Sequence, residues 1–275
     1  MSNEVVKYHN DLNAVSMSGW TSAEMNIFFG IVAKVYNQGT KEVVLNVDDL
    51  KEITDTKNNK NPKRWDEAVE SVAGKIATLR YTYRDADSIE IMNLFAKFKI
   101  DLKSKELKVS ITDYFQYIVN QLSSQFTSWE LAEFTSLKSS YSKTMYRLLK
   151  QWRTVGKKRF KLDEFRVLFD VPESYVTGMI KKRIIDNSIN ELSPYFKGLT
   201  CKVLKENRKG TPVVGYEFTW EPEQTNKFNP NKFKKVKKQD VKPYWLNEPS
   251  SDSNSNNVEV NDIEKIKKDI EQLFS

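Results

Sequence analysis

The stretch Arg159-Phe160-Lys161-Leu162-Asp163-Glu164-Phe165-Arg166-Val167-Leu168-Phe169-Asp170-Val171-Pro172-Glu173 decides the fold, because it predicts a short strand, a helix and a turn in succession. Asp163 is a residue type that often starts a helix. Pro172 lacks a backbone N–H and has a fixed φ, so Val171 and Pro172 are expected to end one helix and start the next. Apolar residues then recur at spacings of four, three and four, as in a helix: Ile185, Ile189, Leu192 and Phe196. Two helices joined by a short turn form a helix-turn-helix.

The segments on either side extend this unit. A helix is predicted from about Ser140 to Arg153, and strands are predicted over 199–204 and 213–220. The segment 205–212 between the strands is polar and contains Gly210 and Pro212, which is typical of a hairpin tip. The order helix, strand, helix, turn, helix, hairpin is that of a winged helix.

The same order occurs once earlier in the chain. A helix is predicted over 21–36, where Thr21-Ser22-Ala23-Glu24 forms a capping box, and a strand from Val43 is followed by a helix that Asp48 could start. A third helix has apolar residues at spacings of four, three, four and three: Trp65, Val69, Val72, Ile76 and Leu79. Strands are predicted over 79–84, 90–101 and 107–111. The expected fold class is therefore α+β, with two tandem winged-helix domains related by a weak internal repeat.

Three segments follow from these patterns. Residues 1–125 form the first winged helix, and residues 126–222 form the second. From residue 223 the apolar periodicity is lost, and Asn, Lys, Pro and Ser predict a flexible basic linker. Helical spacing resumes over 260–274, which predicts a short amphipathic helix within the segment 223–275.

The composition excludes several function classes. The 275 residues include one cysteine and one histidine, which excludes an intrachain disulfide, a Cys/His zinc site and a His-x-His metal site. There is no phosphate-binding G-x-x-x-x-G-K-[ST] loop, and the paired carboxylates are not spaced as in a nuclease. We therefore expect no enzyme activity, no metal and no cofactor. No signal peptide and no apolar run long enough for a bilayer is found, so a cytoplasmic protein without membrane contact is expected.

The excess positive charge lies in one part of the chain. The whole sequence has 44 basic and 37 acidic side chains, a net charge of +7. Residues 126–222 hold 18 basic and 11 acidic side chains, also net +7, whereas residues 1–125 are net −1. This favours a polyanion as partner of the second domain, with a solvated lysine-rich surface as the alternative.

The predicted contacts with DNA in the second domain lie in three places. The third helix of a winged helix enters the major groove by its N-terminal residues, which indicates Ser174, Tyr175, Thr177, Lys181 and Lys182. The hairpin tip could reach phosphates or a minor groove through Asn207, Arg208 and Lys209. The start of the helix at 140 could bind a phosphate through Lys138, Ser139, Ser140, Tyr141, Ser142 and Lys143. The alternatives are a solvated helix face, an exposed turn and simple N-capping, respectively.

The first domain offers a further basic segment at the entrance of its third helix. Its candidate DNA contacts are Asn58, Asn59, Lys60, Asn61, Lys63 and Arg64. The alternative is a flexible loop, since this domain has no excess positive charge. Its long strands could instead form a dimer through a sheet surface or edge.

Three segments carry a resemblance to a known family: residues 3–13, 136–153 and 196–200, of which Lys138–Arg153 is the most specific. They resemble the replication initiator proteins of iteron-containing, theta-replicating plasmids of Gram-positive type. The resemblance covers about residues 3–222. It implies two winged helices that bind repeated origin sequences in double-stranded DNA, help to open the origin and recruit host replication proteins. It also implies repression of the chain's own gene, a homodimer in equilibrium with a monomer, dimerisation by the first domain and the main base contacts by the second.

Two other functions remain open from the sequence. The chain could be a winged-helix transcription repressor without a role in replication. It could also be a rolling-circle initiator that nicks DNA through one of its 12 tyrosines, although the histidine pair of such enzymes is absent.

Overall fold

The second winged helix forms as its sequence predicts. The computed structural model describes residues 4–54, 62–84, 86–101, 103–120, 126–207 and 210–224. Helix α6 (Ser140–Lys150) precedes strand β8 (Lys157–Lys161) and helix α7 (Leu162–Leu168). The third helix consists of α8 (Thr177–Met179), a π-helical segment (Ile180–Asp186) and α9 (Asn187–Leu192), and the wing consists of β9 (Thr200–Lys205) and β10 (Val213–Thr219).

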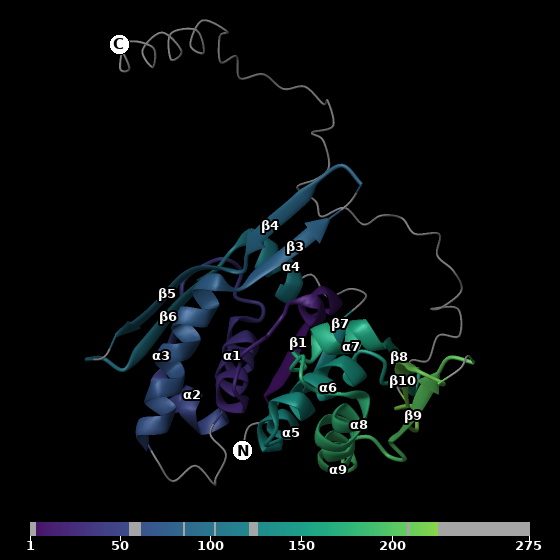
Figure 1. Ribbon diagram of the computed structural model, residues 1–275. Helices are drawn as coiled ribbons and strands as arrows, with labels where there is room; N and C mark the ends of the chain where they lie inside the picture. The colour runs from purple at the N-terminus through teal and green to yellow at the C-terminus, as the bar shows by residue number, and fades with distance from the viewer. Residues whose placement is uncertain are drawn as a thin grey trace, which may run out of the picture. The chain divides into compact units, whose positions relative to one another are not determined.

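The first winged helix repeats this arrangement (Figure 1). Helix α1 (Ser22–Val35), strand β2 (Val43–Asn46), helix α2 (Val47–Thr54) and helix α3 (Pro62–Thr78) are followed by β5 (Phe95–Asp101) and β6 (Glu106–Ile111). The two antiparallel sheets have the orders β2-β6-β5 and β8-β10-β9, so in each copy the last strand lies between the other two. This shared topology confirms the α+β fold class and the internal repeat. An additional hairpin of β3 (Arg80–Arg84) and β4 (Ile89–Asn93) is inserted in the first copy.

Local side chains explain where the helices start. The capping box of α1 is present: the Thr21 hydroxyl accepts from the backbone N–H of Glu24, and the Glu24 carboxylate accepts from that of Thr21. The predicted starters Asp48 and Asp163 are wrong. The Asn46 side chain caps α2 by accepting from the backbone N–H groups of Asp48 and Asp49. At the start of α7, the Glu164 carboxylate accepts from the backbone N–H of Lys161 at 3.2 Å.

The prediction that Val171 and Pro172 end one helix and start the next is also wrong. Helix α7 ends at Leu168, and α8 begins only at Thr177. The backbone N–H of Val171 donates to the carbonyl of Arg166, and that of Asp170 donates to the carbonyl of Val167. This is a Schellman motif, which ends α7 before the proline is reached.

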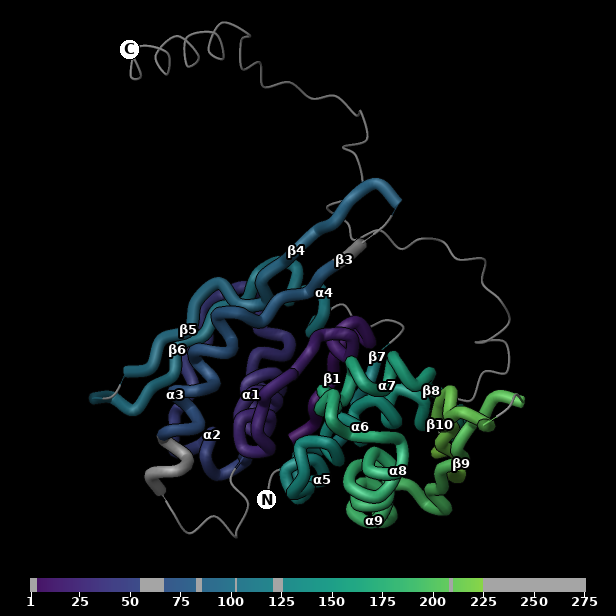
Figure 2. Tube along the Cα trace, in the orientation of Figure 1, coloured from purple at the N-terminus to yellow at the C-terminus, as the bar shows by residue number. Residues whose placement is uncertain are grey.

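Several elements were not predicted. Two of them are strands that pair although they lie at opposite ends of the first 130 residues. Strand β1 (Val5–His9) pairs antiparallel with β7 (Phe126–Glu130), with Val5 opposite Glu130. Both strands are labelled in Figure 2. A 3₁₀ helix (Asn10–Ala14), α4 (Asp113–Asn120) and α5 (Leu131–Ser136) complete the fold. The predicted domain boundary at residue 125 falls between the two paired strands, and all described residues belong to one compact unit, Met1–Phe228.

An aromatic cluster connects the two copies. Trp129 of β7 is 3% exposed, and its ring lies 5.1 Å from that of Phe29 in α1, 4.6 Å from that of Phe134 and 5.7 Å from that of Tyr146 in α6, centroid to centroid. Its indole N–H donates to the Tyr8 hydroxyl at 3.2 Å. The central helices α1 and α6 therefore pack around one shared core.

Candidate nucleic-acid interface

The turn between α7 and α8 is held in shape by two arginines. The Arg166 guanidinium donates to the backbone carbonyl of Tyr175 at 2.7 Å. The Arg183 guanidinium donates to the Tyr175 hydroxyl at 3.2 Å and lies over its ring, 5.2 Å from the centroid. A residue that is bonded at both its backbone and its side chain is restricted before any ligand arrives. The turn is therefore preorganised for binding.

The residues predicted to contact DNA bases lie around this turn, but not all of them belong to the helix. Ser174 and Tyr175 precede the helix, because α8 begins at Thr177 rather than at Ser174. Ser174 is exposed, whereas Tyr175 and Thr177 are half-buried. The side chains that face the interior are apolar or small: Ile180, Ile184, Ile185, Ser188 and Leu192. The outer face of the helix start is consequently open to a ligand.

The two predicted lysines of this helix differ in their charge environment. Lys181 Nζ lies 2.8 Å from Asp186 Oδ1 and 2.9 Å from Oδ2, so its charge is partly neutralised. Lys182 is exposed, and among the described residues no carboxylate lies within ion-pair distance of its ammonium group. Lys182 is therefore the better placed of the two to meet a phosphate.

The start of α6 differs from its prediction. The Ser139 hydroxyl caps the helix by accepting from Tyr141 N, and the N–H groups of Lys138 and Ser139 donate to a carboxylate oxygen of Glu191 at 2.9 and 3.3 Å. The N-capping alternative is therefore realised, and a carboxylate occupies donors that were expected to meet a phosphate.

Two residues of this segment are buried and cannot contact DNA. Ser142 and Lys143 are fully buried, with the Ser142 hydroxyl bonded to that of Ser188 and the Lys143 amino group donating to the carbonyl of Phe134. The prediction that they contact DNA is wrong, because α6 is the central helix of its domain and almost its whole circumference is covered. Exposed Lys138 and half-buried Ser139, Ser140 and Tyr141 remain accessible.

The burial of Lys143 predicts a pH-dependent stability. Burial lowers its pKa to about 7, against a slight opposing effect of Glu191, whereas an unfolded lysine titrates near pH 10.4. Between these values the unfolded chain binds more protons, so the free energy of unfolding should rise with pH. We expect wild type to gain at most about 4 kcal/mol relative to Lys143→Met from pH 7 to pH 10, at ~1.4 kcal/mol per pKa unit. Parallel denaturant titrations of both proteins measure this difference, and a constant difference would contradict a neutral buried amine.

The wing and the first-domain segment are only partly described. Strands β9 and β10 form the predicted hairpin, and Asn207 is exposed near its tip. Arg208 and Lys209 lie outside the described residues, as do Asn58, Asn59, Lys60 and Asn61. Pro62 begins α3, and Lys63 and Arg64 follow in its first turn, although their side chains are not described.

Two residues at the helix start were missed by the sequence analysis. Val176, directly before α8, is 64% exposed, and a Cβ added to Gly178 would meet no atom within 4 Å. An apolar side chain at this place can contact a thymine methyl group, and a glycine lets a backbone approach closely. The signal in the sequence is their position between polar residues, although neither has a side chain that forms hydrogen bonds.

The described residues contain neither a candidate metal site nor a membrane-spanning helix. Within the ranges that the structure describes, no group of three or more His, Cys, Asp or Glu side chains could hold a metal ion. In the same ranges no helix has the length and apolar character needed to cross a membrane.

Comparisons with known proteins agree with the two-domain fold. The family description "Initiator Replication protein, WH1" matches residues 5–150, and "Initiator Rep protein, WH2" matches residues 161–220. "Probable replication protein rep" of Bifidobacterium longum is 30% identical over 222 residues, which are 80% of this chain and 73% of that protein. The crystal structure of Pi initiator protein in complex with iteron DNA is similar with a TM-score of 0.63 and 12% identity, over 82% of this chain and all of that one. At this identity the structural likeness concerns the fold.

Proposed function

The chain belongs to the family of initiator replication proteins, and we propose from this that it starts plasmid replication by binding repeated origin DNA (iterons). The observation that carries the proposal is the exposed start of the third helix in the second winged helix. There a turn held by Arg166 and Arg183 presents Ser174, Thr177 and Lys182, which has no ion-pair partner among the described residues. The Pi initiator protein, whose fold is similar, was crystallised with iteron DNA, which supports the same ligand here.

We assign different tasks to the segments of the chain. Residues 126–222 make the main DNA contacts, because they hold the excess positive charge and the helix-turn-helix described above. Residues 1–125 provide dimerisation and a second DNA contact. The linker and short helix expected over 223–275 lie, from residue 225 on, outside the described residues. The homodimer is in equilibrium with a monomer. Host replication proteins then join the opened origin in the cytoplasm, where the plasmid is.

A footprint on the DNA that flanks the chain's own gene tests this function. We expect protection that recurs at regular intervals, one repeat after another. A single protected palindrome would favour the alternative of a transcription repressor without a replication role, which the family relationship does not favour. Loss of plasmid maintenance on deletion of the gene would provide the second readout.

The proposal also includes that the chain does not cleave DNA itself. Its only histidine, His9, is 7% exposed and accepts a hydrogen bond from the backbone of Asp11. A nicking assay with Mg²⁺ or Mn²⁺ on supercoiled origin DNA should leave the DNA closed. Cleavage at a defined position would instead support the rolling-circle mechanism.

Lys181 and Lys182 of the third helix should contribute unequally to DNA affinity. We expect Lys182→Ala to lower affinity for the repeat about tenfold and to reduce the salt dependence by about one phosphate contact. Lys181→Ala should cost less, because Asp186 already neutralises part of its charge. The matched control is Lys197→Ala, an exposed lysine of the same domain that is paired with Glu221. Fluorescence anisotropy measures all three, and equal losses for Lys182 and Lys197 would contradict the assignment.

A further inference from the structure

Helix α7 ends on an unusual residue. In a Schellman motif the residue after the helix cap adopts a positive φ and is usually glycine, because a Cβ is unfavourable there. In this chain the position is held by Asp170, whose φ is +48°. Aspartate tolerates this conformation better than most residues but less well than glycine. Unlike a glycine, Asp170 offers a side-chain acceptor at this position.

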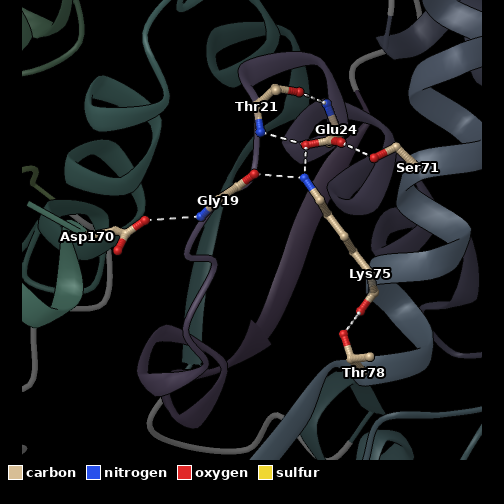
Figure 3. Close-up of polar contacts among 7 residues, drawn as sticks. All are labelled: Gly19, Thr21, Glu24, Ser71, Lys75, Thr78 and Asp170. Carbon is tan, nitrogen blue, oxygen red and sulfur yellow. Dashed lines mark hydrogen bonds and ion pairs between the residues drawn. The ribbon is translucent and has the colours of Figure 1, made fainter. Parts of the chain in front are cut away.

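That side chain contacts the other winged helix. Asp170 Oδ2 accepts a hydrogen bond from the backbone N–H of Gly19 at 3.1 Å (Figure 3). Gly19 lies three residues before α1, in a turn closed by a bond from Trp20 N to the carbonyl of Met17. Its own φ is +70°, in the left-handed region that favours glycine. The contact thus joins two short turns, each of which contains a residue with a positive φ.

The other side of Gly19 is held by the third helix of the first copy. Its carbonyl accepts from Lys75 Nζ at 2.7 Å, and Lys75 belongs to α3. Lys75 Nζ also lies 2.6 Å from Glu24 Oε2, and the second carboxylate oxygen of Glu24 accepts from the Ser71 hydroxyl (Figure 3). One continuous set of bonds therefore runs from the α7–α8 turn through Gly19 to α1 and α3.

Electrostatics keep this network in its charged form. Burial of Glu24 acts to raise its pKa, but the bonds from Lys75, Ser71 and Thr21 outweigh burial and hold the pKa below its usual value. Glu24 therefore remains a carboxylate at neutral pH and keeps Lys75 directed at Gly19. Asp170, in contrast, is exposed and bonds a neutral N–H, so an uncharged acceptor could replace it.

Other contacts between the two copies do not involve either turn. Ser22 Oγ donates to the carbonyl of Leu137, and the buried Arg147 guanidinium donates to the carbonyls of Leu12 and Val15. These bonds attach the N-terminal segment to the region around α6. Together with the aromatic core around Trp129 they join the two copies at α1 and α6, and the contact of Asp170 with Gly19 adds a bond at the α7–α8 turn itself.

We propose that Asp170 is a positioning residue that sets the spacing at which the two helix-turn-helix units meet the DNA. This inference rests on the proposed function, since it assumes that both units bind one stretch of duplex. With the contact in place, α3 and the start of α8 keep one separation, and only DNA segments at the matching separation bind both. Without it, the α7–α8 turn is less constrained relative to α1 and α3, and selectivity for the spacing of the repeat is reduced.

Three variants separate the contact from charge and from folding. Asp170→Gly removes the acceptor and suits the positive φ, so thermal stability should stay at or above that of wild type. Asp170→Asn keeps an acceptor and also tolerates this conformation. Glu173→Gln removes one negative charge from the same exposed turn, as a control for general attraction to phosphates.

The probes are duplexes that carry one repeat identified by the footprint. The repeat is either unchanged or has one or two base pairs inserted between the segments that the two helix-turn-helix units would each cover. We expect wild type, Asp170→Asn and Glu173→Gln to lose at least about tenfold in affinity on insertion, as for one or two lost charged contacts. Asp170→Gly should lose less than about threefold. Hydrogen exchange of the Gly19 amide should be about tenfold faster in Asp170→Gly and unchanged in Asp170→Asn.

The outcomes distinguish this inference from the proposed function. If wild type does not bind the unchanged repeat, the proposed function fails. If wild type binds and Asp170→Gly keeps the full preference for the original spacing, the positioning role is overturned. The same holds if Asp170→Asn behaves like Asp170→Gly, because the hydrogen bond would then not be the cause.

Discussion

Raising the salt concentration from about 50 mM to about 200 mM should weaken binding of this chain to repeated origin DNA about a thousandfold, as about six phosphate contacts would. Each phosphate that a lysine or arginine neutralises releases a condensed counterion, and added salt opposes that release. The second winged helix has the charge for this, with 18 basic and 11 acidic side chains over residues 126–222. Anisotropy titrations at four or more salt concentrations give the slope of log affinity against log salt.

Two controls accompany the salt series. Thermal unfolding at each salt concentration shows whether the fold itself is affected. A duplex of the same length without the repeat should show a similar slope at lower affinity, because phosphate contacts do not depend on sequence. A loss of less than about fourfold corresponds to a single phosphate contact and would contradict a basic DNA-binding face.

Replacing Trp129 with alanine should lower the free energy of unfolding by about 3–5 kcal/mol, the range for large aromatic residues removed from a core. Trp129 is 3% exposed and packs against Phe29 of α1, Phe134 of α5 and Tyr146 of α6. Because it touches the central helices of both copies, both should lose stability together. Thermal unfolding should remain a single transition, shifted down by about 10 °C.

Conservative and distant variants check the origin of this loss. Trp129→Phe keeps an aromatic ring but removes the bond from the indole N–H to Tyr8, and should cost about 1–2 kcal/mol. Val44→Ala, at a side chain that is 52% exposed on β2, should change stability by less than about 0.5 kcal/mol. Two separate transitions in Trp129→Ala would show that the copies do not share one core.

The sequence predicts the repeated elements well because their signals are local. The capping box at Thr21, the spacing of Ile185, Ile189 and Leu192, and the polar segment between β9 and β10 each depend on a few neighbouring residues. The order of these elements is enough to identify a winged helix. The pairing of β1 with β7 could not be predicted in this way, since a five-residue strand carries no signal for a partner more than a hundred residues away.

The candidate site was predicted less well, for a different physical reason. The type of a residue indicates what it can bond, but not whether it is exposed. Lys143 and Lys182 are the same residue type near the start of a helix, yet one is fully buried and the other is exposed. Asp170 was treated only as part of a turn, because its contact with Gly19 crosses 151 residues of sequence.

The pairing of β1 with β7 also has a consequence for synthesis of the chain on the ribosome. Val5 leaves the ribosome before its partner Glu130, which is made about 125 residues later. At about 5–20 residues per second, this strand waits roughly 6–25 s for its partner. During this time the apolar side of β1, with Val6 and Tyr8, has no β7 to cover it, although both are fully buried in the finished fold. Slow translation of residues 10–130 should therefore increase aggregation of nascent chains.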